Sequence, residues 1–300
     1  MKISVHIIAK EDTNLGRHFI DSCLTSIVGY ADELILIDNG CSSEVKEVIQ
    51  KFCPYFPSFV YKESKLSDFA SLRNECLKST GSDVDYFHWI DTDEIWFPVE
   101  LVKLKSFLQT TDANRVATNL IHFMGDPFHF QEIYPKFNIF KMPKDRSKIK
   151  WRGGVHESLD LGGKSVNTAF NYLHFGYCRE QWRICLRWLH YAILEFGNVN
   201  CYRQYNDKGK TLDYFTDQRT PDQIIDDRVP ISHEYSGGYP SFVEKWIRLH
   251  EVSNHTWDEW LKKNDDQSFW LDWQELREQK GNWKDTLKDI VAKMGWKEKL

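Results

Sequence analysis

Apolar and polar positions in the first hundred residues alternate between two patterns. Short, mostly apolar runs, as expected for buried strands, are separated by segments in which apolar residues recur with helical spacing. The expected strands are Ile3–Ala9, Glu33–Asp38, Phe59–Tyr61 and a run from Tyr86 to Asp91, and the expected helices are Leu15–Val28, Glu44–Phe52 and Asp68–Lys78. Strands that alternate with helices in this way are typical of a parallel sheet covered on both faces. We therefore expect an α/β fold with a doubly wound, mostly parallel sheet.

The pattern changes after Pro98. A helix that ends near Leu108 is followed by extended segments, which indicate a small mixed or antiparallel sheet: Arg115–Met124, Ile133–Met142 and Trp151–Leu159. Residues 199–245 have no clear periodicity and form a candidate lid, whereas the Trp-rich residues 246–300 have helical spacing. We therefore expect a main domain over residues 1–198, an irregular segment over 199–245 and a helical C-terminal extension over 246–300.

Composition narrows the classes of function. A net charge of −5 provides no basic field, so nucleic acid is not favoured as a partner. No apolar run is long enough for a membrane span, and the first strand begins too early to leave room for a secretory signal. The seven cysteines contain no Cys-X-X-Cys pair, which is typical of reduced thiols. We expect a cytoplasmic protein without a transmembrane segment, and the lysines near its C-terminus leave weak peripheral binding to the inner face of a membrane open.

Acidic residues gather where the expected strand from Tyr86 ends. Asp91 is the last residue of this run, and Asp93 and Glu94 come directly after it. Other polar residues lie at the ends of two earlier strands: Lys10 and Glu11 after the first, and Asp38 at the end of the second. Because the carboxyl ends of parallel strands share one edge of a sheet, these groups should converge. Clustered carboxylates suit Mg²⁺ or Mn²⁺. On the simpler alternative, the cluster is an acidic turn and nearby Arg73 pairs with Glu75 or Glu94 on the surface.

Four blocks of residues resemble family 2 glycosyltransferases in their order along the chain. They are Lys10–Glu11, Ala31–Asp38 with Gly40 and Ser42, Phe69–Asn74, and Trp89–Glu94. The resemblance implies a GT-A fold and transfer of a sugar from a nucleotide-diphosphate donor, usually with inversion. A UDP-sugar is the expected donor, and a hydroxyl group of a glycan is the expected acceptor.

The resemblance also implies a role for each matching residue. Asp38 would contact the nucleoside, Arg73 would lie near the base or the diphosphate, and Asp91 would face the ribose or the sugar, with Lys10 and Glu11 at the same donor site. Asp93 would bind Mn²⁺ or Mg²⁺. We expect Glu94 to be structural, pairing with Arg73 or capping the helix that follows.

Two later blocks extend the resemblance, and the first of them is similar to a branch that makes bacterial lipopolysaccharide and cell-surface glycans. Trp151–Leu159 is similar to its Gly-X-Val-His-Glu-X-Leu segment and implies that Glu157 is the catalytic base, with Asp160 and His156 as alternatives; His156 could also bind the donor. The block around His174 implies a further metal ligand. Arg179 lies close enough along the chain to contact the phosphates.

Two other classes of function remain open. A nucleotidyltransferase that acts on sugar phosphates also uses an α/β sheet with acidic metal ligands, but it usually has a glycine-rich loop after the first strand. Residues 10–16 contain a single glycine, which argues against that class. The other alternative is a non-catalytic protein that binds nucleotide sugars, and measurement of nucleoside diphosphate release with Mn²⁺ distinguishes all three.

Overall fold

We analysed a computed structural model, which describes residues 1–11, 14–66, 68–124, 127–153, 157–178, 233–244, 246 and 247. These residues belong to one compact unit, comprising residues 1–179 and 228–251. His156, Arg179 and most of the predicted lid and C-terminal extension lie outside the described residues. The domain boundaries at 198 and 245 therefore stay predictions.

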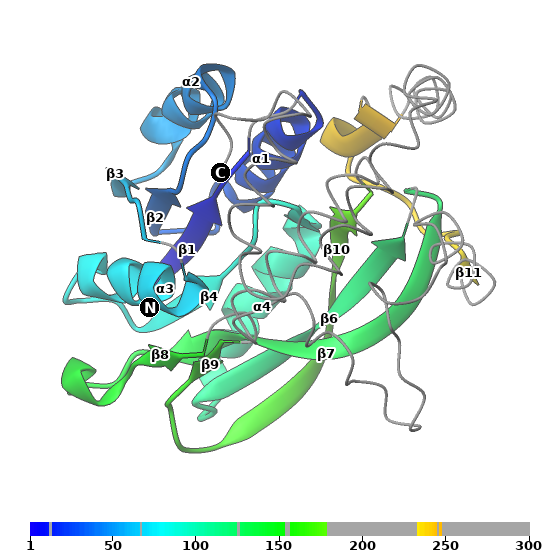
Figure 1. The fold of residues 1–300 in the computed structure, drawn as a ribbon. Helices are drawn as coiled ribbons and strands as arrows, with labels where there is room; N and C mark the ends of the chain where they lie inside the picture. The colour runs from blue at the N-terminus through cyan, green and yellow to red at the C-terminus, as the bar shows by residue number, and fades with distance from the viewer. Residues whose placement is uncertain are drawn as a thin grey trace, which may run out of the picture. The chain divides into compact units, whose positions relative to one another are not determined.

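Nine of the described strands form one sheet (Figure 1). Eight of them lie in the order β3-β2-β1-β4-β7-β6-β10-β5, and β11 pairs with β7. Their bounds are β1 Ile3–Ala9, β2 Glu33–Asp38, β3 Phe59–Glu63, β4 Tyr86–Trp89, β5 Glu94–Trp96, β6 Arg115–Met124, β7 His129–Lys141, β10 Ser165–Tyr177 and β11 His233–Glu234. Strands β3, β2, β1 and β4 are parallel, as predicted. In the second half, β7 is antiparallel to β4 and β6, and β10 is parallel to β6 but antiparallel to β5.

The helices begin and end close to the predicted positions. They are α1 Asn14–Ile27, α2 Ser43–Phe52, α3 Phe69–Ser79 and α4 Pro98–Thr110, with the 3₁₀ turns η1 Cys53–Tyr55 and η2 Arg146–Lys148. Ser42 is the N-cap of α2 and accepts a hydrogen bond from the backbone N–H of Val45. The Asp68 side chain caps α3 in the same way through Ser71. These caps supply acceptors for N–H groups that a helix leaves unpaired.

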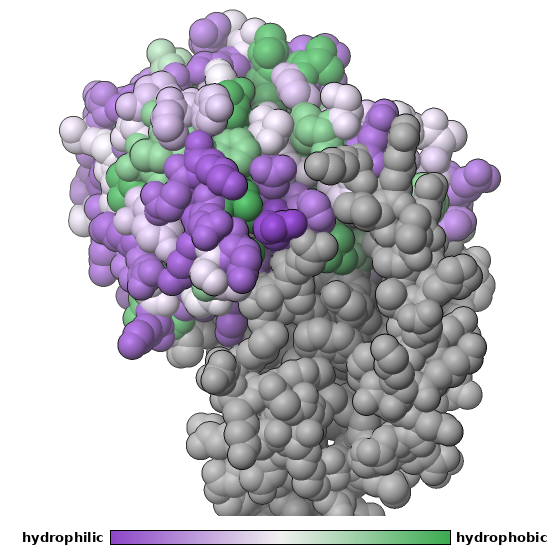
Figure 2. Space-filling model, turned by 90° about the horizontal axis from the view of Figure 1, so that it is seen from above, coloured by the Kyte–Doolittle hydropathy of each residue, from purple (hydrophilic) through white to green (hydrophobic). Residues whose placement is uncertain are grey.

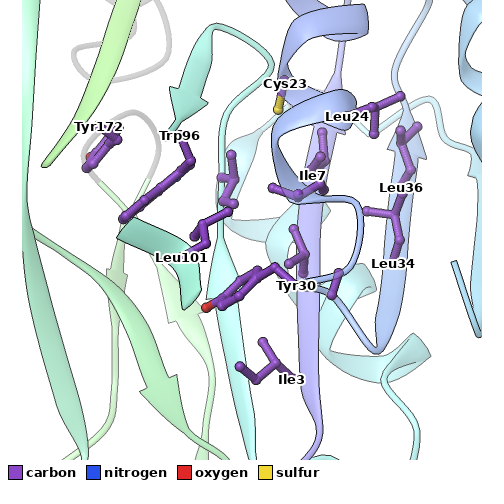
Figure 3. Packing of buried hydrophobic residues seen from close by; sticks show 14 of the residues in the cluster. Ile3, Ile7, Cys23, Leu24, Tyr30, Leu34, Leu36, Trp96, Leu101 and Tyr172 are labelled. Atoms are coloured by element: carbon purple, nitrogen blue, oxygen red, sulfur yellow. The ribbon is translucent and has the colours of Figure 1, made fainter. Parts of the chain in front are cut away.

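Apolar side chains cover both faces of the parallel strands. One cluster joins alternate residues of β1 and β2, such as Ile7 and Leu36, to α1, α2 and α4 (Figure 3). The intervening residues, such as Ile8 and Ile35, pack with Leu72 and other residues of α3. Because every residue of β1 and β2 is buried, these strands read as mostly apolar runs without a helical or an alternating pattern. The α/β fold with helices on both faces is therefore confirmed.

Two local predictions need correction, and one strand was not predicted. Trp151–Leu159 is not one extended segment, because its ends form the antiparallel pair β8 (Trp151–Arg152) and β9 (Ser158–Leu159). Glu94 begins the short strand β5 and does not cap a helix. Residues 165–177 form one long strand, of which the sequence indicated little. Strand β5 pairs with β10, and β10 pairs with both β6 and β5; such distant pairing leaves no local signal.

Residues near the predicted C-terminal extension contribute to the core. Trp246 is 1% exposed and packs edge-on against Phe19 of α1 and Phe175 of β10. Val243 and Ile247 belong to the same apolar cluster. Trp246 is therefore a core residue of this unit.

The described surface mixes hydrophilic and hydrophobic residues. On the face seen in Figure 2, hydrophilic residues cover much of the described part, and hydrophobic residues lie in patches among them. Scattered apolar exposure of this kind is ordinary for a folded domain. Within the described residues, we find no helix with the length and apolar character that crossing a membrane requires.

Candidate functional site

The loops that follow β1, β2 and β4 meet at one edge of the sheet. The Glu11 carboxylate accepts a 2.7 Å hydrogen bond from the Thr92 hydroxyl, which joins the first loop to the third. The backbone oxygen of Glu11 accepts a bond from the N–H of Ser42, which joins the first loop to the second. A β-carbon at Gly16 would collide with the Glu11 carboxylate, so glycine at this position of α1 leaves room for the Glu11 side chain.

Asp38, at the end of β2, is bound by its own turn. Its Oδ1 accepts hydrogen bonds from the backbone N–H groups of Gly40 and Cys41, at 2.8 and 2.7 Å. Its Oδ2 accepts a 2.5 Å bond from the Tyr61 hydroxyl and lies 3.5 Å from the ammonium of Lys46. The side chain is 1% exposed, and Gly40 has φ +110°, which favours glycine. Most of the acceptor capacity of Asp38 is therefore used within the protein.

Asp91, which follows β4, is held by cations from distant elements. Its Oδ1 accepts bonds from Arg73 Nη2 at 2.5 Å and from the Trp89 indole N–H at 2.8 Å. Its Oδ2 lies 3.2 Å from the Lys136 ammonium. The side chain of Asp91 is 33% exposed, whereas that of Arg73 is 3% exposed. Asp91 is therefore a carboxylate that the protein fixes firmly and a ligand can still reach.

Arg73 connects Asp91 to Glu157. Its Nε donates to Glu157 Oε1 at 3.2 Å, and the Glu157 side chain is 5% exposed. The guanidinium lies 3.9 Å from the centre of the Trp89 ring, which adds a cation–π attraction. The simpler alternative, in which Arg73 pairs with Glu75 or Glu94 on the surface, does not describe this buried arrangement.

Lys136, on β7, is a site residue that sequence reasoning missed. Its ammonium contacts Glu94 Oε1 at 2.5 Å as well as Asp91. The antiparallel register of β4 and β7, continued beyond β4, places Asp91 opposite Lys136. Since strand register is set by the folded sheet, a lysine in an extended segment gave no signal in the sequence. Glu94 therefore pairs with Lys136, not with Arg73 as expected.

These five residues, Glu157, Arg73, Asp91, Lys136 and Glu94, form what we call the charged chain. Burial raises the pKa of Asp91, but the charges of Lys136 and Arg73 outweigh burial and leave this pKa below its usual value. Glu94 is fully buried, and burial raises its pKa to about 7 despite Lys136. The pKa of Lys136 is raised because both carboxylates outweigh its burial. Asp91 thus stays anionic at neutral pH.

Asp93 lies beside His174. The Asp93 Oδ1 is 3.6 Å from His174 Nε2, and their side chains are 5% and 14% exposed. The Nδ1 atoms of His174 and His122 are 2.7 Å apart, and the two rings stack. His122, on β6, is a second residue that sequence reasoning missed. Its contact orients the Nε2 of His174 toward Asp93.

The remaining predicted residues lie apart from the charged chain or outside the described part. Lys10 is exposed. Asp160 is 64% exposed and lies 3.5 Å from the equally exposed Arg152, a surface pair of low energetic value. His156 and Arg179 are outside the described residues. Of the candidate bases that the structure describes, Glu157 is the one that contacts Arg73.

The chemistry of Asp93 and His174 suits one divalent cation. Within the described residues, no group of three or more His, Cys, Asp or Glu side chains is placed to bind a metal. A Mg²⁺ or Mn²⁺ ion in a nucleotide site commonly takes one or two protein ligands, with substrate phosphates and water completing its shell. A carboxylate and an imidazole 3.6 Å apart therefore fit such an ion, with the imidazole favouring Mn²⁺.

Two bacterial proteins are among the solved structures that are similar to this chain. The S. aureus TarS fragment 1–349 matches with 11% identity and a TM-score of 0.41, over 58% of this chain and 60% of that one. Glucosyl-3-phosphoglycerate synthase from Mycobacterium tuberculosis, solved with Mg²⁺ and UDP, matches with 20% identity and a TM-score of 0.31, over 40% and 43%. The chain thus spans less than two thirds of either structure. A comparison with curated protein sequences gives no significant match.

A family model covers most of the fold described above. The model for glycosyl transferase family 2 matches residues 4–160, which is more than half of the 300 residues. The match contains the ends of β1, β2 and β4 together with Arg73, Asp91 and Glu157. The resemblance found in the sequence is confirmed, and this chain belongs to glycosyl transferase family 2.

Proposed function

We propose that this protein transfers a sugar from a nucleotide-diphosphate donor, a UDP-sugar, to a hydroxyl group of a glycan acceptor with inversion. Membership of the family supports sugar transfer. The observation that carries the proposal is Asp91, an accessible carboxylate fixed by two cations two residues before Asp93, which faces His174. Polar groups held in fixed positions at the carboxyl edge of a sheet are what a ligand site of this fold requires.

In this proposal, Asp91 accepts a hydrogen bond from a ribose hydroxyl of the donor. Asp93 and His174 hold Mn²⁺ or Mg²⁺ beside the diphosphate. A divalent ion bound there supplies positive charge that stabilises the leaving nucleoside diphosphate. Arg73 is already engaged by Asp91 and Glu157, so we assign it to positioning these carboxylates and not to direct binding of phosphate.

Glu157 is the proposed base. Inverting transfer requires a group that takes the proton from the acceptor hydroxyl as the oxygen attacks the sugar. Arg73 engages the Oε1 of Glu157, so we assign proton acceptance to Oε2. The same Arg73 binds Asp91, which couples the base to the donor side. Asp160, exposed beside Arg152, lacks such a coupling.

The Asp93→Ala variant tests the metal site. We expect the purified variant to keep its melting temperature within a few degrees but to lose Mn²⁺-dependent binding of UDP, measured by calorimetry, and Mn²⁺-dependent release of UDP from UDP-sugars. The matched control is Asp112→Ala, because Asp112 is 77% exposed and pairs with Lys164 at the surface. Normal UDP binding and turnover by Asp93→Ala would contradict the proposed metal site. Failure of the wild-type protein to release UDP from any common donor would contradict the proposed function.

A further inference from the structure

The ammonium group of Lys136 is fully engaged by three neighbours. It lies 3.2 Å from Asp91 Oδ2, 2.5 Å from Glu94 Oε1 and 4.3 Å from the centre of the Trp89 ring. A lysine ammonium has three N–H donors. Two donors are directed to the carboxylates and the third is available to the indole face. Lys136 therefore has little capacity left to bind a ligand directly, although its side chain is 20% exposed.

The hydrogen bonds to Asp91 leave one acceptor position. A carboxylate offers about four such positions, two on each oxygen. Arg73 Nη2 and the Trp89 indole N–H occupy both positions of Oδ1, and Lys136 occupies one position of Oδ2. One acceptor position of Oδ2 therefore remains, beside the position that Lys136 occupies. The Asp91 side chain is 33% exposed, so solvent can reach this carboxylate.

We propose that Lys136 is a positioning residue of the donor site, fixing the Asp91 carboxylate opposite Arg73 so that the open position of Oδ2 meets the donor's ribose hydroxyl. This role rests on the proposed function. Without Lys136, only Oδ1 stays anchored, and the carboxylate can rotate about the bond that joins it to its β-carbon. Donor binding then has to restrict that rotation, which weakens the affinity.

A purely structural role for Lys136 has to be separated from this one. Glu94 is fully buried, and a buried carboxylate without its cation destabilises a fold strongly. The single variant Lys136→Met could therefore lose function because it unfolds. Adding Glu94→Gln removes the unpaired negative charge and keeps a side-chain oxygen that can accept from the backbone N–H of Asp91, as Glu94 does at 3.1 Å.

The experiment compares four proteins: wild type, Lys136→Met, the double variant Lys136→Met/Glu94→Gln, and Lys141→Met. Lys141 is the matched control, because it is an exposed lysine on the same strand. Urea unfolding measures stability, and calorimetry with UDP and MnCl₂ measures binding. We expect Lys136→Met to be clearly destabilised and the double variant to regain most of the wild-type stability. The double variant should nevertheless bind UDP about tenfold more weakly, the effect of one well-placed hydrogen bond.

Each other outcome has a definite meaning. Wild-type affinity in the stable double variant overturns the positioning role, because Lys136 would then serve only to neutralise Glu94. Equal weakening of UDP binding in Lys141→Met overturns it as well, because the effect would be general to lysines of β7. Absence of UDP binding by the wild-type protein contradicts the proposed function itself, and the positioning role with it.

Discussion

Asp38 ends β2 and Asp91 follows β4, the two parallel strands on either side of β1, yet the protein holds the two carboxylates by different means. Asp38 is bound by the backbone of its own turn and by Tyr61 of the adjacent strand, and its side chain is 1% exposed. Asp91 is bound by Arg73 of α3 and Lys136 of β7, and its side chain is 33% exposed. Each pKa is lowered, because hydrogen bonds at Asp38 and cations at Asp91 outweigh the effect of burial.

We infer different roles from this difference: Asp38 maintains a turn, whereas Asp91 presents a carboxylate to a ligand. A carboxylate that caps backbone N–H groups stabilises the turn, but little of its acceptor capacity is left for a donor. A carboxylate fixed by side chains can keep one oxygen accessible. We therefore expect substitutions of Asp91 to affect donor chemistry and substitutions of Asp38 to affect stability.

The largest expected effect is on the activity of Asp91→Asn. Asparagine has nearly the same shape, but its neutral amide removes the charge that Arg73 and Lys136 fix. We expect kcat/KM for the UDP-sugar to fall about a hundredfold, which corresponds to roughly 3 kcal/mol of transition-state stabilisation. The melting temperature should change little, because Glu157 and Glu94 still pair with the two cations. Wild-type kcat/KM in this variant would mean that Asp91 does not contact the donor.

The next largest effect is on the stability of Asp38→Asn. The amide cannot serve the two backbone N–H groups, Tyr61 and Lys46 as well as the carboxylate does. We expect the free energy of unfolding, measured with urea at pH 7, to fall by about 2 kcal/mol. UDP affinity of the folded protein should stay within a few fold of wild type.

The opposite result would reverse the comparison. If Asp38→Asn keeps its stability but loses UDP binding, then Asp38 contacts the nucleoside, as the family resemblance implies. Tyr61→Phe is the control, because it removes one donor to Asp38 without altering the carboxylate. Its unfolding free energy should fall by less than that of Asp38→Asn.

The smallest expected effect is in the acid dependence of stability. The folded-state pKa of Asp38 is lowered, so Asp38 stabilises the fold at a pH above its unfolded value of about 4. As the pH falls below that value, the unfolded chain binds a proton before the folded chain does, and this stabilisation is lost. The free energy of unfolding, measured with urea between about pH 5 and pH 2.5, should therefore fall less steeply with decreasing pH for Asp38→Asn than for wild type. Parallel curves would show that Asp38 has the same pKa in both states.

The parallel half of the fold was predictable because its signals are local. Buried strands such as Ile3–Ala9 read as apolar runs, Ser42 caps α2, and helical spacing gave α1 to α4 within a few residues. Strand β5 has only three residues and forms through pairing with β10. Distant pairing of this kind leaves little trace in a short sequence window.

The candidate site was predictable only where its residues follow strands of the parallel half. Glu11, Asp38 and Asp91 could be placed at one edge because strand ends are visible in the sequence. The partners of Asp91 were not predictable to the same degree. Glu157 was identified through the family resemblance. Neither strand ends nor the resemblance indicated Lys136 and His122, because the register of β7 with β4 places Lys136 at the site and the pairing of β6 with β10 places His122 there.

The three-residue strand β5 has a consequence for redesign of this protein. Its register with β10 pairs Glu94 with His174, so the spacing between Asp93 and Trp96 sets which side chains meet the imidazole. Inserting one residue there would turn every side chain of β5 to the other face of the sheet. The turn around Gly162 and Gly163 connects β9 to β10, and a β-carbon at Gly162 would meet open space. An insertion is therefore better placed beside Gly162 than in β5, which should keep its length.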